Sequence, residues 1–277
     1  MKHLPTSGLA LALLAGVPAW AGAGIASVEV TPNHAAVRIE LPGNVKADLD
    51  IAFEQALGLT ADSLGISARL VNPSDLNLLS RLPSTGGIPA AFPVLITIEP
   101  PASGALAFSG IVSIDLHTHN LNYVTGTPLR LFAAEIGKNF QDLTGSMGMG
   151  SMRTGGSKGG FSEFLIASDL RPIATVIDDK FKRLQGILDA NAGAIPGALA
   201  ATLQTQLRAA RTAYDANDPV TASDRIGTFA DTVKQNSGAS IPDVWRSARD
   251  VTNVAGDLRA GAATLKFSLL LKASGGS

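Results

Sequence analysis

The sequence predicts an α+β protein, mainly β and then α, in which an antiparallel β-sandwich precedes a small helical bundle of about four helices. Between residues 26 and 168, apolar and polar residues alternate in short stretches, and glycine and proline separate these stretches about every ten residues. After residue 172, apolar residues recur at spacings of three and four, the period of an amphipathic helix. We therefore expect a sandwich domain at 26–171 and a helical bundle at 172–262.

The strands of the predicted sandwich follow from the period-two alternation, which puts apolar side chains on one face of each strand. The stretches at 45–53 and 112–116 are the clearest examples. Because the connections are short, the strands should pair mainly antiparallel. The expected strands are 28–31, 37–41, 45–53, 66–70, 94–98, 106–124, 129–133, 140–144, 150–154 and 162–168, with a short helix at 76–82.

Seven glycines crowd residues 145–160 and invite comparison with a phosphate-binding loop. Gly150 and Gly155 have the outer spacing of such a loop, but Gly156 and Ser157 stand where lysine followed by serine or threonine is needed. A phenylalanine-containing strand, and not a helix, follows. We therefore interpret these glycines as residues of hairpin turns and bulges, where positive φ angles are required.

Proline, glycine and asparagine divide the helical domain into four predicted helices. The first has its apolar residues between Val176 and Leu188, the second runs from Pro196 to about Asn217, and the third begins at Asp218. The fourth is expected to begin at residues 240–243 and to bury a stripe formed by Val244, Trp245, Ala248, Val251, Val254 and Leu258.

The tail at 264–272 shows a different period. Leu265, Phe267, Leu269 and Leu271 recur at every second position, and the polar residues Thr264, Lys266, Ser268 and Lys272 stand beside them, which predicts a strand. We expect this strand to return to the sandwich, because a sheet edge is the nearest template for its backbone hydrogen bonds. The alternative is a fourth helix that continues through Leu271. The glycines at 256 and 261 disfavour it, since each costs a helix about 1 kcal/mol relative to alanine.

Residues 1–21 have the order of a secretory signal peptide. Lys2 and His3 precede an apolar run at 9–17, and Ala19-Trp20-Ala21 forms a cleavage site. The apolar run is too short to span a bilayer, which takes roughly 20 residues. We therefore predict an exported protein, periplasmic or extracellular, whose mature chain begins near residue 22 and has no membrane span.

Composition excludes several classes of partner and site. The net charge is −1 and the pI is about 6.4, so no basic field favours nucleic acid. The absence of cysteine excludes disulfides and thiolate metal sites. We expect no catalytic residues and no cofactor. Glu135, Asp142 and Glu163 lie on or beside different strands, but any sandwich offers such carboxylates by chance.

Asp115, His117 and His119 form the one chemical constellation of the β-region. Their period-two spacing puts all three side chains on the same strand face. Two imidazoles and a carboxylate can bind zinc or another divalent metal. Alternation alone, however, also predicts polar residues on a solvated face, and this is the interpretation that we favour. His34 could complete a metal site only if its turn folds near this strand.

Two resemblances to known families extend this reading. The segment LRAARTAYDANDPVTASDRIGTFADTVKQNSGASI at 207–241 resembles the FIMAH module of bacterial extracellular proteins, which it matches at Phe229, Val233, Gly238 and Ile241. The segments DLHTHNLNY, TPLRLF, GSMRTGGSKGGFSEFLIASDLRP and IPDVWRSARDVTNVAG together resemble an uncharacterised family of proteobacterial exported proteins with a domain of unknown function. These resemblances imply secretion and this architecture, and nothing catalytic.

We therefore expect a non-catalytic exported protein that interacts with another envelope or extracellular protein. Glycan binding is disfavoured, because the mature chain offers only Trp245, Tyr123 and Tyr214 as tryptophan or tyrosine platforms. The alternative is a metal-binding protein or metal-dependent hydrolase that uses Asp115, His117 and His119. A metal titration distinguishes the two hypotheses.

Overall fold

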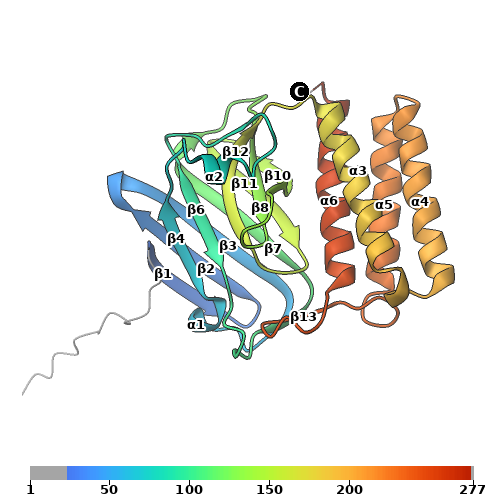
Figure 1. Cartoon of the computed structure of the whole chain (residues 1–277), viewed down its shortest axis with the longest axis horizontal. Coiled ribbons are helices and arrows are strands. Elements are labelled where there is room, and N and C mark those ends of the chain that lie inside the picture. The colour runs from blue at the N-terminus through green and yellow to red at the C-terminus, as the bar shows by residue number, and fades with distance from the viewer. Residues whose placement is uncertain (1–23, 276–277) are drawn as a thin grey trace, which may run out of the picture.

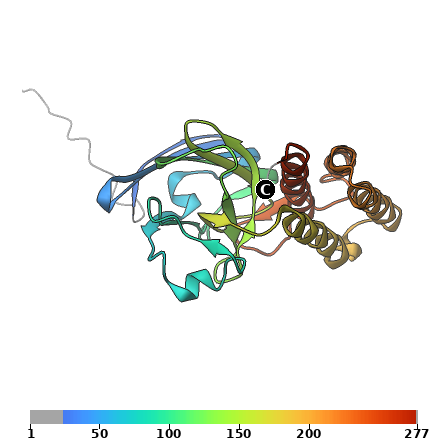
Figure 2. The same cartoon turned by 90° about the horizontal axis from the view of Figure 1, so that it is seen from above.

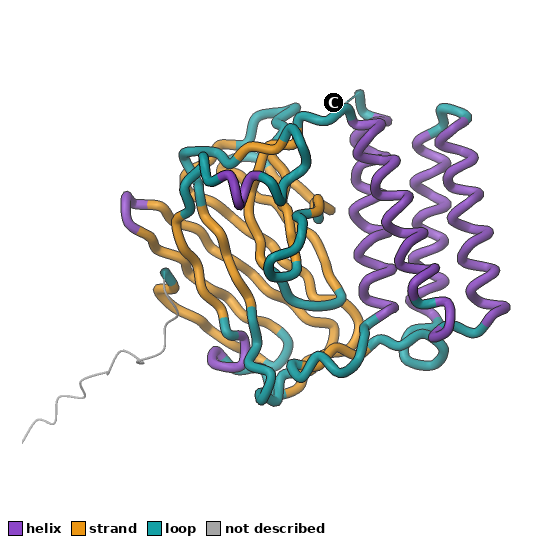
Figure 3. The backbone as a smooth tube through the Cα atoms, in the orientation of Figure 1, coloured by secondary structure: helices purple, strands orange, loops and turns teal. Residues whose placement is uncertain are grey.

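A computed structural model describes residues 24–275, and it places a two-layered β-sandwich beside a four-helix bundle (Figure 1). The predicted signal peptide lies outside the described residues. Strands precede residue 170 and the long helices follow it, apart from one short strand near residue 245 (Figure 3). The α+β class and the antiparallel sandwich are confirmed.

The first sheet has the order β1-β2-β3-β7-β11-β10, and every pairing in it is antiparallel. Its long strands β3 and β7 alternate buried and partly exposed residues, as the sequence predicted. Its strands are β1 (Ile25–Thr31), β2 (His34–Leu41), β3 (Val45–Leu57), β7 (Ala107–Asn122), β10 (Thr144–Gly148), β11 (Ser151–Lys158) and β13 (Val244–Arg246), which pairs with β7.

The second sheet has the order β4-β6-β12-β8-β9, and β5 pairs with β12. Strands β8 and β12 are buried on both faces. Their inner face packs against the first sheet, and their outer face is covered by a smaller hydrophobic cluster that contains Leu78, Phe132 and Leu165. The strands are β4 (Ile66–Leu70), β5 (Gly86–Gly87), β6 (Val94–Ile98), β8 (Leu129–Ala134), β9 (Gln141–Asp142) and β12 (Glu163–Asp169), with short helices α1 (Ala61–Leu64) and α2 (Leu76–Leu79) between them.

The glycine-rich stretch forms the β10–β11 hairpin, as expected. Gly150 lies in its turn with a φ of 92°. Gly156 is needed for another reason, because a Cβ there would collide with the carbonyl oxygen of Leu143. Turn geometry and close backbone packing therefore explain these two glycines.

The bundle contains α3 (Ile173–Ala190), α4 (Gly197–Asp215), α5 (Pro219–Gln235) and α6 (Val254–Ala273). Figures 1 and 2 show α3 and α6 facing the sandwich, with α4 and α5 beyond them. The side chain of Asp218 caps α5 by accepting a hydrogen bond from the Thr221 N–H (2.9 Å). Among residues 24–275, none of the helices is apolar over a length that would cross a bilayer.

The predicted start of the fourth helix is wrong. Residues 242–253 are not helical, and Val244–Arg246 instead form β13, which pairs with Ala107–Ser109 of β7. The indole of Trp245 stacks on Phe108 with a centroid distance of 5.4 Å. Packing against the sandwich therefore outweighs the helical spacing of the apolar residues in this segment.

The predicted final strand is also wrong, because residues 264–272 belong to α6. Leu265 and Leu269, four residues apart, are buried in the bundle core. Thr264 faces the sandwich, where its hydroxyl donates to the Thr144 carbonyl oxygen (2.9 Å). The tail does dock on the sandwich, but as a helix that is buried on two sides.

Gly261 illustrates why glycine does not exclude this helix. A Cβ on Gly261 would lie 3.1 Å from a methyl carbon of Leu184 on α3. The small residue lets α3 and α6 approach closely, and this packing offsets the lower helix propensity of glycine.

Candidate functional site

The outer face of the first sheet carries the predicted constellation. Asp115, His117 and His119 point away from the core, and they alternate with the buried residues Ile114, Leu116 and Thr118. The prediction that the three side chains share one face is confirmed. They do not, however, form a single cluster.

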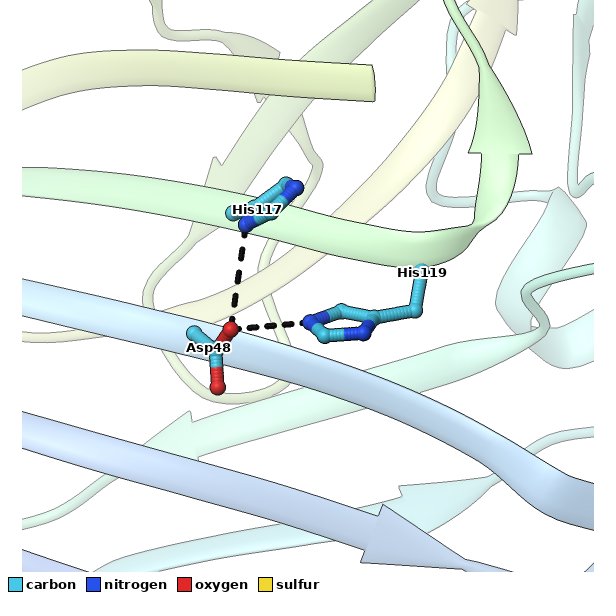
Figure 4. Close-up of side chains that lie close together, drawn as sticks. All are labelled: Asp48, His117 and His119. Atoms are coloured by element: carbon cyan, nitrogen blue, oxygen red, sulfur yellow. Dashed lines mark hydrogen bonds and ion pairs between the residues drawn. The ribbon is translucent and has the colours of Figure 1, made fainter. Parts of the chain in front are cut away.

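The structure places Asp48 of β3, and not Asp115, beside the two imidazoles (Figure 4). Asp48 Oδ2 lies 2.8 Å from His119 Nε2 and 3.7 Å from His117 Nδ1. One ligand atom from each of the three residues lies within 4.8 Å of the others. Asp115 instead lies opposite Asp50, two pairs farther along the β3–β7 ladder.

The register of β3 against β7 decides which carboxylate joins the histidines. Asp48 pairs with His117 across the ladder. The period-two pattern of residues 45–53 puts Asp48 and Asp50 on a polar face, but it does not give their partners on β7. The sequence therefore contained the signal for a polar face but not for the choice of Asp48.

His34 lies on the same sheet face but outside this cluster. Its Nε2 atom lies 3.1 Å from Asp50 Oδ1. The hairpin that carries His34 does fold near β3, yet its imidazole is bonded to a different carboxylate. His34 is therefore a matched reference for the two clustered histidines.

Electrostatics favour a neutral imidazole at His117. Burial lowers the pKa of His117, and Arg153 and His119 lower it further, although the carboxylates of Asp48 and Asp115 act in the opposite direction. Arg153 Nη2 lies 3.5 Å from His117 Nδ1. Burial also raises the pKa of Asp115, although Arg153 acts in the opposite direction. A neutral His117 has a nitrogen lone pair, and a metal ion at Nδ1 would have to displace the Arg153 guanidinium that now faces this atom.

The cluster has the donor set of a zinc or copper(II) site. Two imidazole nitrogens and one carboxylate oxygen suit both ions, and a protein that supplies three ligands leaves positions for water or another ligand. The side chains of Asp48 and His119 are 42% and 47% exposed, so solvent can reach those positions.

A second candidate lies where the sandwich meets the bundle. It is a cleft of about 560 Å³, and four separate chain segments line it. Its polar and aromatic lining includes Glu99, Glu135, Lys158, Trp245, Arg249 and Asp257. Sequence analysis missed this cleft, because no single segment carries its pattern.

The remaining carboxylates that the sequence offered are held by bases. Asp142 Oδ2 accepts a hydrogen bond from Lys180 Nζ (2.6 Å), and Glu163 is paired with Arg81. Neither carboxylate is thereby free to act with Glu135 as a glycosidic pair.

Ser157 lies in a segment whose spacing matches a hydrolase motif. Residues 155–159 fit the spacing G-x-S-x-G, in which the serine of α/β-hydrolases occupies a sharp turn between a strand and a helix. Ser157 instead lies within β11, paired with Ser113 of β7. Its backbone context is therefore that of a sheet residue and not of a nucleophile elbow.

A comparison with protein families gives a match that covers nearly the whole chain. The chain matches a family of unknown function, DUF6689, over residues 9–273. The chain belongs to the DUF6689 family. No curated protein matches it. The match extends over sandwich and bundle alike, which agrees with the sequence-based expectation of an uncharacterised family.

Proposed function

We propose that this DUF6689 protein is an exported, non-catalytic accessory protein that binds one divalent transition-metal ion at Asp48, His117 and His119. The observation that carries the proposal is the convergence of three ligand atoms from two neighbouring strands within 4.8 Å. The sequence alone favours a merely solvated face, because it suggests Asp115 and not Asp48 as the carboxylate beside the histidines. The contacts of Asp48 with both imidazoles support a metal site instead.

Export and ancestry are part of the same proposal. The order of basic, apolar and small residues at 1–21 supports cleavage of a signal peptide near residue 22. We also propose that the protein is proteobacterial and that the bundle is related to the FIMAH module. The complete burial of Phe229, Val233 and Ile241 in the bundle core supports the second relationship.

Calorimetric titration of the untagged mature chain with zinc chloride, and separately with copper(II), tests the metal site. We expect a stoichiometry close to one, and loss of binding when His117→Ala and His119→Ala are combined. Affinity should fall as the pH drops, because protons compete for the imidazoles. The substitutions themselves should change stability by less than about 0.5 kcal/mol, since both side chains lie on the outer face of the sheet and not in the core.

Two variants from the same face are the controls. His34→Ala removes a histidine that is bonded to Asp50, and Asp115→Asn removes the carboxylate that the sequence suggested. Both should bind metal as the parent chain does, whereas Asp48→Asn should weaken binding. Equal affinities for the parent chain and the double histidine variant, or no heat of binding at all, would refute the site. Ester turnover by the zinc-loaded chain would favour a metal-dependent hydrolase.

A second candidate function is interaction with another envelope or extracellular protein. Leu57 and Val244 are 74% and 41% exposed, and both border an open hollow of about 490 Å³ beside Phe108. Exposed apolar side chains gathered at one place are typical of protein-binding surfaces. We expect a pull-down from envelope extract to recover a partner with the parent chain and not with Leu57→Asp. Recovery of that partner by both chains would exclude this surface.

A further inference from the structure

The cleft at the junction of sandwich and bundle has the size and place of a small-molecule site. Its volume of about 560 Å³ lies within the usual range of ligand pockets, which prefer the junctions between packed units. Its walls are the end of β6, the loop after β8, the connection between β11 and β12, and the segment from β13 into α6.

Charges of both signs lie in this cleft without pairing to one another. Among the described residues, neither Lys158 nor the carboxylates of Glu135 and Asp257 have an ion-pair partner within 4.0 Å. At the rim, Arg249 and Glu99 do pair, at 3.4 Å. No ion pair therefore holds these three inner charges, although Arg183 lies near both Lys158 and Asp257.

Burial disfavours the charged forms of two of these groups. It lowers the pKa of Lys158 to about 8, and the nearby Arg183 lowers it further. Burial also raises the pKa of Asp257, although the charges of Lys158 and Arg183 and a hydrogen bond from the Gly159 backbone act in the opposite direction. A ligand that brought an opposite charge to each group would stabilise both charged forms.

The cleft also offers an apolar wall of fixed geometry. Trp245 stacks on Phe108 and meets the edge of Phe161 at a centroid distance of 5.0 Å. A Cβ on Gly160 would lie 3.0 Å from Trp245 Nε1, so the backbone packs closely against the indole. The side chains of Ile136 and Val251 add exposed apolar surface at the rim.

We propose that this cleft binds a small zwitterion with an apolar side chain, that is, an apolar α-amino acid or a short peptide. The ligand carboxylate pairs with Lys158, its ammonium group pairs with Glu135 and Asp257, and its side chain lies against Phe161 and Trp245. A simple carboxylate would bring no positive charge to Glu135 and Asp257, and a simple amine would bring no negative charge to Lys158. The zwitterion is the class that satisfies all three. This inference is independent of the proposed metal site.

Intrinsic fluorescence of Trp245 provides the readout. The sequence contains two tryptophans, and the other, Trp20, lies within the predicted signal peptide, so the chain expressed from residue 22 has one. The probes are L-leucine, 4-methylpentanoate, which lacks the amine, and 3-methylbutylamine, which lacks the carboxylate. We expect saturable binding of leucine, and binding at least about tenfold weaker for each analogue. Leucyl-leucine distinguishes a peptide site from an amino-acid site by binding more tightly than leucine.

Substitutions at Lys158 test whether this lysine pairs with the ligand carboxylate. Lys158→Met should weaken leucine binding by about tenfold or more. It should not weaken the binding of 3-methylbutylamine, because the variant removes a positive charge near the amine. Lys158→Arg should retain most of the affinity for leucine. Lys182→Met is the control, because that side chain is 78% exposed on α3. A thermal melt of each variant confirms folding. No saturable change with any probe up to about 10 mM, or equal leucine affinities for Lys158→Met and the parent chain, would overturn the proposal.

Discussion

Replacing Lys180 by methionine is expected to lower the free energy of unfolding by about 3–5 kcal/mol, the cost of leaving a buried charge without its partner. Lys180 Nζ donates to Asp142 Oδ2 at 2.6 Å, to the Ser268 hydroxyl at 2.8 Å and to the Thr264 carbonyl oxygen at 3.1 Å. The side chains of Lys180 and Asp142 are only 6% and 3% exposed. The ammonium group thus joins α3, α6 and the sandwich edge at β9. Urea denaturation of the parent and variant chains measures the effect.

The destabilisation should depend on pH. Burial raises the pKa of Asp142, but the charge of Lys180 and hydrogen bonds from Lys180 and Thr144 outweigh burial and hold the pKa below its ordinary value. A carboxylate with a depressed pKa stabilises the fold above its unfolded pKa of about 3.9, and this contribution is lost as the pH falls through the folded pKa. In the Lys180→Met variant the effect of burial on the pKa of Asp142 is no longer opposed by Lys180, so the folded chain binds a proton at Asp142 more readily. The difference in unfolding free energy between parent and variant should therefore begin to narrow as the pH falls toward about 4 and should continue to narrow below it.

Two further variants show whether the buried charge is responsible. Lys182→Met removes an exposed lysine from the same helix, whose partner Asp179 lies 3.9 Å away, and should cost less than about 0.5 kcal/mol. Combining Lys180→Met with Asp142→Leu should recover part of the loss, because no unpaired charge remains. A double variant no more stable than Lys180→Met would contradict this explanation.

The spacing of apolar residues along each strand and helix explains which elements could be predicted from the sequence. The alternation along β3 and β7 and the three- and four-residue spacing in α3, α4 and α5 reflect elements that bury one face and expose the other. Neither pattern contains information about register. The sequence therefore predicted the polar face of Asp115, His117 and His119, whereas Asp48 joined them only through the β3–β7 ladder.

Helix α6 shows where that reasoning fails. The helix is covered by α3 and α5 on one side and by β7, β10 and β11 on the other, so it has little amphipathic character. Leu265, Phe267, Leu269 and Leu271 then alternate by coincidence with residues such as Ser268, which is buried against Lys180. A helix that packs on two partners at once loses the period by which a helix is recognised.

The docking of α6 on the sandwich is also the reason why the junction cleft could not be predicted from the sequence. Its lining comes from residues near 98, 135, 158 and 245–257, which are brought together only when α6 and β13 dock on the sandwich. Lys158, Gly159 and Gly160 belong to the glycine-rich stretch that the sequence explained by turns alone. A Cβ on Gly159 would lie 2.6 Å from Asp257 Oδ1, so this glycine serves the contact with α6. That role depends on a residue about one hundred positions away.

Replacing Leu269 by alanine is expected to cost about 2–5 kcal/mol, while Leu270→Ala should cost less than about 0.5 kcal/mol. Leu269 is fully buried in the bundle core, and its neighbour Leu270 is 46% exposed. The two substitutions remove the same atoms from adjacent positions of α6, so their difference measures burial alone.

Because α6 packs on both the bundle and the sandwich, Leu269→Ala should lower the stability of both units. We expect the helical far-UV circular dichroism signal and the fluorescence of Trp245 to shift together to a lower urea midpoint. Trp245 reports on the sandwich side of the junction, through its contact with Phe108, whereas the dichroism signal is dominated by the bundle. Equal stabilities of the two leucine variants would place the tail outside the core. A dichroism midpoint that moved without the fluorescence midpoint would mean that α6 stabilises the bundle alone.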